Sequence, residues 1–315
     1  MERRPLDRAA AAAVVAALVA AAGCGAAEPA PGAATAPPST SASPAGPAAK
    51  PSPSAAPEAA ADLPAPDEAI PEDAARLAKA LRETTAALND AVDAWTGAGK
   101  AARGKPPREV ELLALYQQRI YRFAARHPTV ATRAFARLPR GLAAQARDNT
   151  RAIRELLALA RPIKGSAPFK VRPPLPAADL LGHFMKAERR FGVEWEVLAA
   201  VMFAETKFGR VRSASYAGAQ GPMQFMPATW KAYGMGGDIQ DPRDAVMAAA
   251  NYLRATGAPR DYQRALHAYN PSQAYVDAIL LHARQIKRDA RNFYVYYNWQ
   301  VFVLTTSGER RLTGP

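Results

Sequence analysis

Three short segments decide how this sequence is interpreted: ETKFG at residues 205–209, SYAGAQGPMQFMP at residues 215–227 and AYN at residues 268–270. The first segment ends an apolar stretch that begins near Val193 and repeats large side chains at helical spacing. Glu205 falls on the apolar stripe, four residues after Val201 and three before Phe208. A carboxyl group there costs free energy unless it is paired, or unless its pKa rises so that it stays protonated. A general acid near neutral pH needs such a proton, so Glu205 is the candidate catalytic residue.

The second segment, residues 215–227, is predicted to be a loop because glycine and proline interrupt it repeatedly. It presents backbone groups, the Gln224 amide and the soft apolar side chains of Met223 and Phe225 just beyond the carboxyl group. Sugars are bound by this mixture, because amides hydrogen-bond hydroxyl and acetamido groups while apolar side chains lie against the ring. We therefore expect a carbohydrate groove with Met223 and Phe225 on its floor.

In this order, the three segments resemble the lytic transglycosylases of the soluble-lytic-transglycosylase family, which share the goose-lysozyme type of fold. The family pattern is a catalytic Glu followed by Ser, then Gly-Ala-x-Gly-Leu-Met-Gln, then Ala-Tyr-Asn. The sequence departs from it at Thr206, at Pro222 and at Pro271, where the family has Ser, Leu and often Gly. The resemblance covers about residues 177–290. It implies a mainly α fold with a lysozyme-like helical catalytic domain.

The resemblance also implies an activity on peptidoglycan glycan strands. Glu205 would act as an acid and then as a base at the β-1,4 bond between MurNAc and GlcNAc, giving a 1,6-anhydro product without a cofactor or a metal. Substrate-binding roles fall on residues of the loop and of the third segment: Ser215, Met223, Gln224, Phe225, Tyr269 and Asn270. Other roles stay open for three of them. Ser215 also fits a loop cap, Tyr269 a core position, and Asn270 the N-cap of a helix running to Leu281.

Three other functions compete with this interpretation. A muramidase of the same fold would hold a water with a second carboxylate, for which four residues are candidates: Asp238, Asp241, Asp244 and Asp261. The sequence around Asp241-Pro242 also fits the start of a helix. A wall-binding lipoprotein would keep the groove without catalysis. The net charge of +13 is compatible with nucleic-acid binding, but the export signal described next argues against a nucleic-acid partner.

The start of the chain predicts export. Three arginines within the first eight residues precede an apolar run at residues 9–22, which is typical of a signal peptide over residues 1–23. Ala21-Ala22-Gly23-Cys24 resembles the lipobox of bacterial lipoproteins, which implies lipidation of Cys24 and anchoring to a membrane that faces the cell wall. An ordinary signal peptide with a stray cysteine is the alternative. Cys24 is the single cysteine of 315 residues, which excludes an intramolecular disulfide framework and a Cys-based zinc site.

The remaining organisation follows from composition and periodicity. Residues 24–66 are rich in Ala, Pro, Ser and Thr and predict a disordered linker. Residues 67–165 are predicted to form a helical module. This module is either a scaffold packed on the main domain or a unit that binds the substrate or an envelope partner. The catalytic domain is expected over residues 166–290. Residues 291–315 are expected to be a short β-rich extension, with a strand or a hairpin around Asn298.

Overall fold

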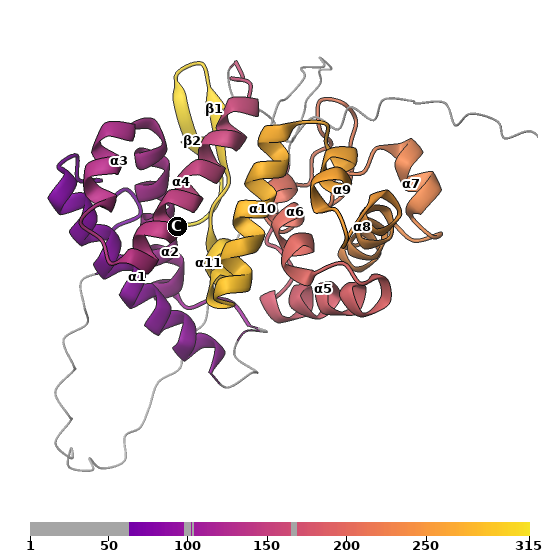
Figure 1. Cartoon of the computed structure of the whole chain (residues 1–315), viewed down its shortest axis with the longest axis horizontal. Helices are drawn as coiled ribbons and strands as arrows, with labels where there is room; N and C mark the ends of the chain where they lie inside the picture. Colours follow the sequence, from indigo (N-terminus) through magenta and orange to yellow (C-terminus); the bar gives the residue numbers. More distant parts are fainter. Residues whose placement is uncertain (1–62, 98–101, 103, 165–168) are drawn as a thin grey trace, which may run out of the picture. The chain divides into compact units, whose positions relative to one another are not determined.

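The computed structural model describes residues 63–97, 102, 104–164 and 169–315. In these residues the chain forms eleven α-helices and one two-stranded sheet (Figure 1), which confirms the predicted mainly α fold with a short C-terminal β segment. The predicted signal peptide, Cys24 and nearly all of the predicted linker lie outside the described residues. None of the helices in the described ranges has the length and apolarity needed to cross a membrane.

The N-terminal part of the described chain contains four helices: α1 (Ala74–Thr96), α2 (Arg108–Arg126), α3 (Pro128–Phe135) and α4 (Arg140–Leu159). The Asp73 carboxylate caps α1 by accepting hydrogen bonds from the backbone N–H groups of Ala75 and Arg76 at 3.0 and 2.9 Å. Apolar side chains such as Leu77, Leu81 and Leu88 recur at helical spacing in α1 and are buried, and Pro128 begins α3 as a first-position proline. The helices therefore follow from periodicity and from local stop and start signals.

Six helices follow: α5 (Ala177–Phe191), α6 (Trp195–Thr206), α7 (Pro227–Tyr233), α8 (Pro242–Thr256), α9 (Tyr262–Tyr269) and α10 (Gln273–Arg288). Asp241 caps α8 as predicted. The prediction that Asn270 caps the next helix is wrong, because Asn270 ends α9 and Ser272 caps α10. The Ser272 N–H donates to the Asn270 carbonyl at 2.7 Å, and its hydroxyl accepts from the Tyr275 N–H at 3.4 Å. This turn around Pro271 delays the helix by two residues.

The C-terminal segment contains a helix before its hairpin. Helix α11 (Arg291–Asn298) precedes β1 (Phe302–Thr305) and β2 (Gly308–Arg311), which pair antiparallel with Phe302 opposite Arg311. The predicted turn around Asn298 is therefore wrong, although the hairpin exists. Aromatic and β-branched residues favour strands, but here Phe293 and Tyr296 are buried by packing on the rings of Phe208 and Phe203. Tertiary packing overrides the local preference.

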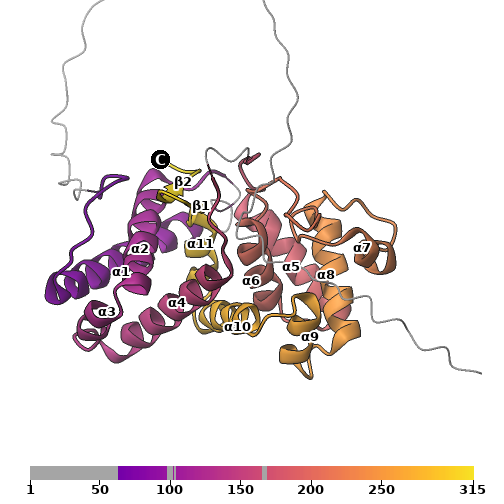
Figure 2. The ribbon, with the colours of Figure 1, turned by 90° about the horizontal axis from the view of Figure 1, so that it is seen from above.

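Helix α6 lies in the centre of the packing and carries Glu205. It packs against α5, α8, α10 and α11, and Figure 2 shows it between α5 and α10. Every residue from Val197 to Thr206 is buried. The sequence predicted an apolar stripe on this helix, whereas the structure covers it on all sides.

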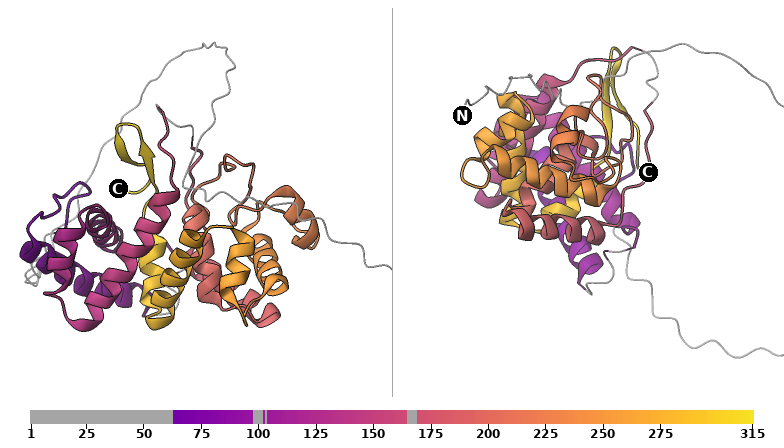
Figure 3. Two further views of the ribbon diagram at one scale, coloured as in Figure 1. Left: turned by 45° about the horizontal axis from the view of Figure 1, so that its top comes forward. Right: turned by 90° about the vertical axis from the view of Figure 1, so that its right-hand side faces the viewer.

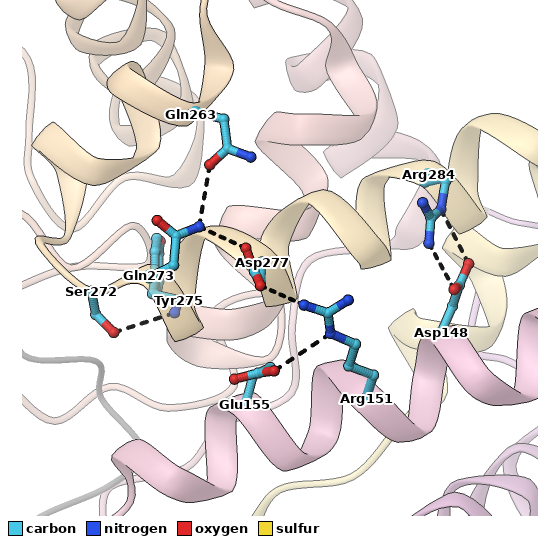
Figure 4. A network of polar contacts seen from close by, with 9 residues as sticks. All are labelled: Asp148, Arg151, Glu155, Gln263, Ser272, Gln273, Tyr275, Asp277 and Arg284. Carbon is cyan, nitrogen blue, oxygen red and sulfur yellow. Dashed lines mark hydrogen bonds and ion pairs between the residues drawn. The ribbon is translucent and has the colours of Figure 1, made fainter.

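Helices α4 and α10 lie side by side (Figures 1 and 3). Ala152 of α4 and Ala278 of α10 are fully buried where the helices meet, and small side chains allow a close approach. The edges carry ion pairs (Figure 4): Arg151 lies 2.7 Å from Asp277, and Arg284 lies 2.7 Å from Asp148. The core thus continues across the predicted boundary at residue 165.

Candidate functional site

Glu205 occupies the last turn of α6 with only 4% of its surface exposed. The hydroxyl of Tyr275, from the first turn of α10, donates to its Oε1 at 2.8 Å. Burial, followed by the Glu205 charge, raises the pKa of Tyr275 well above its ordinary value, so the phenol keeps its proton. Burial and the Glu205 charge also raise the pKa of Tyr269. The structure thus brings the predicted acid together with two tyrosines.

The loop after Glu205 is tied to the ends of two helices. The Thr206 hydroxyl donates to the Pro222 carbonyl at 2.6 Å and accepts from the Gly209 N–H at 2.9 Å. The Tyr269 hydroxyl, at the end of α9, donates to the Met223 carbonyl at 2.6 Å. Because both contacts are buried, the backbone of the loop is fixed relative to α6 and α9.

Gly221 shows why the loop needs glycine. It has a positive φ of 74°, and a Cβ there would lie 1.9 Å from the Ile239 carbonyl oxygen. The turn is closed by reciprocal hydrogen bonds of 2.9 Å between the backbones of Gln220 and Phe225. The Gln224 side chain folds inside this turn, and its Nε2 donates to the Gly221 carbonyl at 2.9 Å. The glycine therefore permits a compact loop that a side chain would disrupt.

The structure places the other predicted binding residues mostly inside the protein. Met223 and Phe225 are buried in the core, and the Phe225 ring packs 5.8 Å from the Tyr269 ring. The Ser215 hydroxyl accepts from the Ala219 N–H at 2.9 Å, which is the loop-cap role. Gln224 and Asn270 are buried, and among the described residues Gln224 Oε1 and Asn270 Nδ2 have no hydrogen-bond partner. None of these six residues lines the pocket that contains Glu205.

That pocket is built from segments far apart in the sequence. Its cavity volume is about 90 Å³. Its walls are the end of α6 with Lys207, the apolar side chains Ile153, Leu156 and Leu157 of α4, and residues 301–304 around β1. Gln118 and Arg122 of α2 and His282 of α10 also line it. Helices predicted as a separate module and the C-terminal hairpin therefore form part of the wall beside Glu205.

Among the residues that the structure describes, the pocket is lined by two cationic side chains, Arg122 and Lys207, and by one carboxylic acid, Glu205. Burial and the neighbouring Arg122 lower the pKa of Lys207 to about 7, against the attraction of the Glu205 carboxylate. Burial, assisted by Lys207, lowers the pKa of His282 to about 3, so its imidazole is neutral at ordinary pH. Glu309 of β2 accepts from Arg122 Nε at 3.0 Å and also pairs with Arg126. Within the described ranges, Glu205 is the single carboxylic acid in the lining.

The four aspartates that could have supplied a second carboxylate have other roles. Asp241 caps α8, and Asp261 caps α9 by accepting from the Arg264 N–H at 2.9 Å. Asp244 accepts from the backbone N–H of Asp238 at 3.1 Å, while Asp238 accepts from that of Gln240 at 2.8 Å. In the part of the chain that the structure describes, no three His, Cys, Asp or Glu residues form a group that could hold a metal ion.

The sequence motifs do not predict that three residues belong to this site: Tyr275, Lys207 and His282. Tyr275 sits on the apolar stripe of α10 and looks like an ordinary core residue, and its partner is 70 positions away. Lys207 adjoins the motif, but its sequence neighbours do not indicate that it shares a pocket with Glu205. A weak signal was present for His282, since a histidine on an apolar helix face is either satisfied in the core or available to a ligand.

Comparison with protein families gives one match. Residues 182–289 match the family model described as Transglycosylase SLT domain, and this region contains Glu205, the loop and α10 up to its end. Searches of curated proteins and of solved structures found no match. The match supports a lytic transglycosylase that acts on peptidoglycan in the cell envelope, in general terms.

Proposed function

We propose that the chain, through its transglycosylase SLT domain, cleaves the β-1,4 bonds between MurNAc and GlcNAc in peptidoglycan and releases 1,6-anhydro ends. The observation that carries this proposal is the environment of the Glu205 carboxyl group. It is the one carboxylic acid among the described residues of the pocket, it is buried, and a phenol donates to its Oε1. A single acid fits a reaction in which the substrate itself supplies the nucleophile.

In the proposed reaction, Glu205 first donates a proton to the departing glycosidic oxygen. The acetamido group of the substrate stabilises the cationic centre at C1. Glu205 then takes the proton from the C6 hydroxyl as that oxygen attacks C1, which closes the anhydro ring. Because the nucleophile is part of the substrate, its position supplies the proximity advantage without a bound water. Tyr275 keeps the carboxyl oriented through its hydrogen bond to Oε1.

The loop supports this site by its rigidity. The contacts of Thr206 with Pro222 and of Tyr269 with Met223 fix the loop backbone. The sugar-binding roles of Gln224 and Asn270 come from the family pattern alone, since both residues are buried and neither lines the pocket with Glu205. Ser215, Met223, Phe225 and Tyr269 act in this proposal by shaping the loop that meets the glycan.

Hydrolysis by the same fold is the less favoured reaction. An inverting or retaining glycosidase pairs two carboxylates across the scissile bond. Each of the four candidate aspartates already accepts a backbone hydrogen bond in a cap or a turn. A water-holding second acid therefore has no support among the described residues.

The location proposed for the enzyme is the cell envelope. Its substrate class implies export, and the signal-like residues 1–23 agree with that. Lipidation of Cys24 would hold the chain on a membrane facing the wall, with residues 24–66 as the tether.

A single substitution tests whether Glu205 does the chemistry. Glu205→Gln removes the proton donor while preserving the size of the side chain, so digestion of insoluble peptidoglycan should fall by about 10²–10⁴-fold, as expected for a general acid. Binding to the same material should be largely retained. Glu196→Gln, in the first turn of the same helix and half-buried, is the matched control and should digest like the parent. Undiminished digestion by Glu205→Gln would overturn the proposal.

A further inference from the structure

Lys207 brings an ammonium group into the pocket that Glu205 lines. The residue ends α6 in the left-handed conformation with φ of 52°. Its Nζ donates to the Phe203 carbonyl at 3.0 Å and lies 4.1 Å from the centre of the Phe203 ring. Phe203, Glu205 and Lys207 all line the same pocket. The cation therefore lies over the last turn of the helix that carries the acid.

The charge of Lys207 differs from those of the arginines around it. Arg122 is held by Glu309, and Arg210 lies over the Tyr297 ring at 5.0 Å and donates to the Lys207 carbonyl. Among the described residues, no ion pair includes Lys207. A half-buried ammonium costs desolvation free energy, and burial together with the nearby Arg122 depresses the pKa of Lys207. An anionic ligand would relieve that cost.

His282 provides an independent sign of a ligand in the same pocket. Its side chain is 1% exposed and lines the pocket, and neither ring nitrogen has a hydrogen-bond partner among the described residues. Buried polar groups are normally paired, so two unpaired nitrogens in a pocket wall indicate that a bound molecule or a water meets them. The facing walls are apolar, from Leu156 and Leu157 of α4 and Phe302 of β1.

We propose that Lys207 binds a carboxylate that the glycan strand carries on its muramyl sugar, beside the bond that Glu205 cleaves. The inference rests on the proposed function. Two sources supply this chemistry: the lactyl carboxylate of a strand without peptide, and a carboxylate of the stem peptide on an intact strand. The lactyl carboxylate, like the carboxylate of a terminal alanine in the stem, adjoins one methyl group, which suits the apolar walls. An ammonium and a carboxylate in a partly dry pocket form a charge-assisted hydrogen bond.

Binding measurements with three probes test the proposal. The full chain carries Glu205→Gln so that the strand is not cleaved, and equilibrium binding is compared for peptide-free glycan strands, stem-bearing strands and chitotetraose, which has no carboxylate. Adding Lys207→Met should weaken binding of a carboxylate-bearing strand by about 10-fold and leave chitotetraose unaffected. Lys207→Arg should restore most of the affinity. Lys231→Met, at an exposed position on α7, is the matched control and should change nothing.

The pattern of losses identifies the source of the carboxylate. A loss with peptide-free strands assigns the lactyl group, and a loss confined to stem-bearing strands assigns the peptide. Equal affinities with and without Lys207, an equal loss on chitotetraose, or no binding of either carboxylate-bearing strand would each overturn the inference. Digestion by the parent chain is measured in parallel. If the parent digests peptidoglycan while Lys207→Met binds normally, the inference fails and the proposed function stands; if the parent does not digest it, the proposed function fails on its own.

Discussion

At the scale of single residues, the contact between Tyr275 and Glu205 is the most consequential. It links the first turn of α10 to the last turn of α6 through one hydrogen bond of 2.8 Å between two buried side chains. An acid that must first give and then recover a proton has to keep its orientation through both steps. We therefore regard Tyr275 as a positioning residue that acts through Glu205.

Tyr275→Phe should separate this role from simple packing. The ring remains, so the free energy of unfolding should fall by only about 0.5–1.5 kcal/mol, the usual value of one hydrogen bond. The kcat for peptidoglycan digestion should fall by about 10-fold while KM is little changed, because the substrate does not contact the phenol. Steady-state kinetics together with urea unfolding check both expectations. A change confined to KM, or to stability, would contradict the positioning role.

His282 makes the stability of the protein depend on pH. Its pKa is lowered from the ordinary 6.5 to about 3 by burial and by Lys207. The unfolded chain therefore takes up a proton between pH 6.5 and about 3 that the folded chain refuses, so this contribution to stability is present above pH 6.5 and is lost as the pH falls toward 3. His282→Phe keeps an aromatic ring among Phe203, Tyr296 and Trp299 and cannot be protonated.

We predict that parent and His282→Phe differ mainly in acid. Between pH 7 and pH 4, the parent should lose on the order of 3 kcal/mol more unfolding free energy than the variant. Urea titrations at several pH values measure this difference. Parallel stability curves for the two proteins across this pH range would show that His282 is not the group responsible.

At the scale of elements, the sequence predicts those whose signals are local. Asp241 and Pro242 mark the start of α8, and the apolar repeat from Leu77 marks α1. The secondary-structure predictions are wrong where contacts between residues distant in the sequence determine the conformation. The aromatic run in α11 has the composition of a strand, yet it is helical because Phe293 and Tyr296 pack on rings at the end of α6.

The same distinction holds for the site. Glu205 and the loop could be recognised from the sequence because their motifs are contiguous. The pocket wall could not, because it joins Ile153 of α4, His282 of α10 and Val303 of β1. No local sequence pattern predicts that these three segments lie next to one another. Lys207 and Tyr275 acquire their importance only from that meeting.

The contact between α4 and α10 should control both stability and activity. Ala278 is fully buried in one cluster with Ala152, so we expect a larger side chain at residue 278 to overpack this contact. Ala278→Leu should lower the unfolding free energy by about 1–3 kcal/mol through overpacking and should reduce digestion by moving α4 away from the pocket. Arg151→Ala, which removes the exposed ion pairs of Arg151 with Asp277 and Glu155, should cost less than about 1 kcal/mol and leave activity unchanged. Thermal unfolding and digestion assays compare the two, and equal effects would contradict this reasoning.

At the scale of the whole molecule, residues before and after the matched domain are part of its core. The ring centres of Trp299 and of Tyr121 in α2 lie 5.9 Å apart. Gln118 and Gln300 exchange two buried hydrogen bonds of 2.9 and 2.7 Å. Residues 64–315 belong to one compact unit. The family match covers residues 182–289, whereas the hydrophobic core also includes residues before and after this region.

A fragment of residues 166–315 should therefore fold poorly. It would expose the faces of α10 and of Trp299 that pack on α4 and α2, and it would lose the α4 wall of the pocket. We expect no cooperative thermal transition, a weak near-ultraviolet circular dichroism signal and no digestion, in contrast to a chain beginning at residue 64. A fragment that unfolds cooperatively and keeps the near-ultraviolet spectrum of the longer chain would show that the first four helices are dispensable.

The most direct test of the central claim, that the single acid Glu205 catalyses ring closure, is mass spectrometry of the products. Purified peptidoglycan is digested with the parent chain, and the soluble fragments are weighed. We predict fragments that end in anhydro-muramyl sugars and are therefore lighter by one water molecule than hydrolysis products. These fragments should be absent when Glu205→Gln is used. Fragments with ordinary reducing ends, or anhydro fragments still formed by Glu205→Gln, would contradict it.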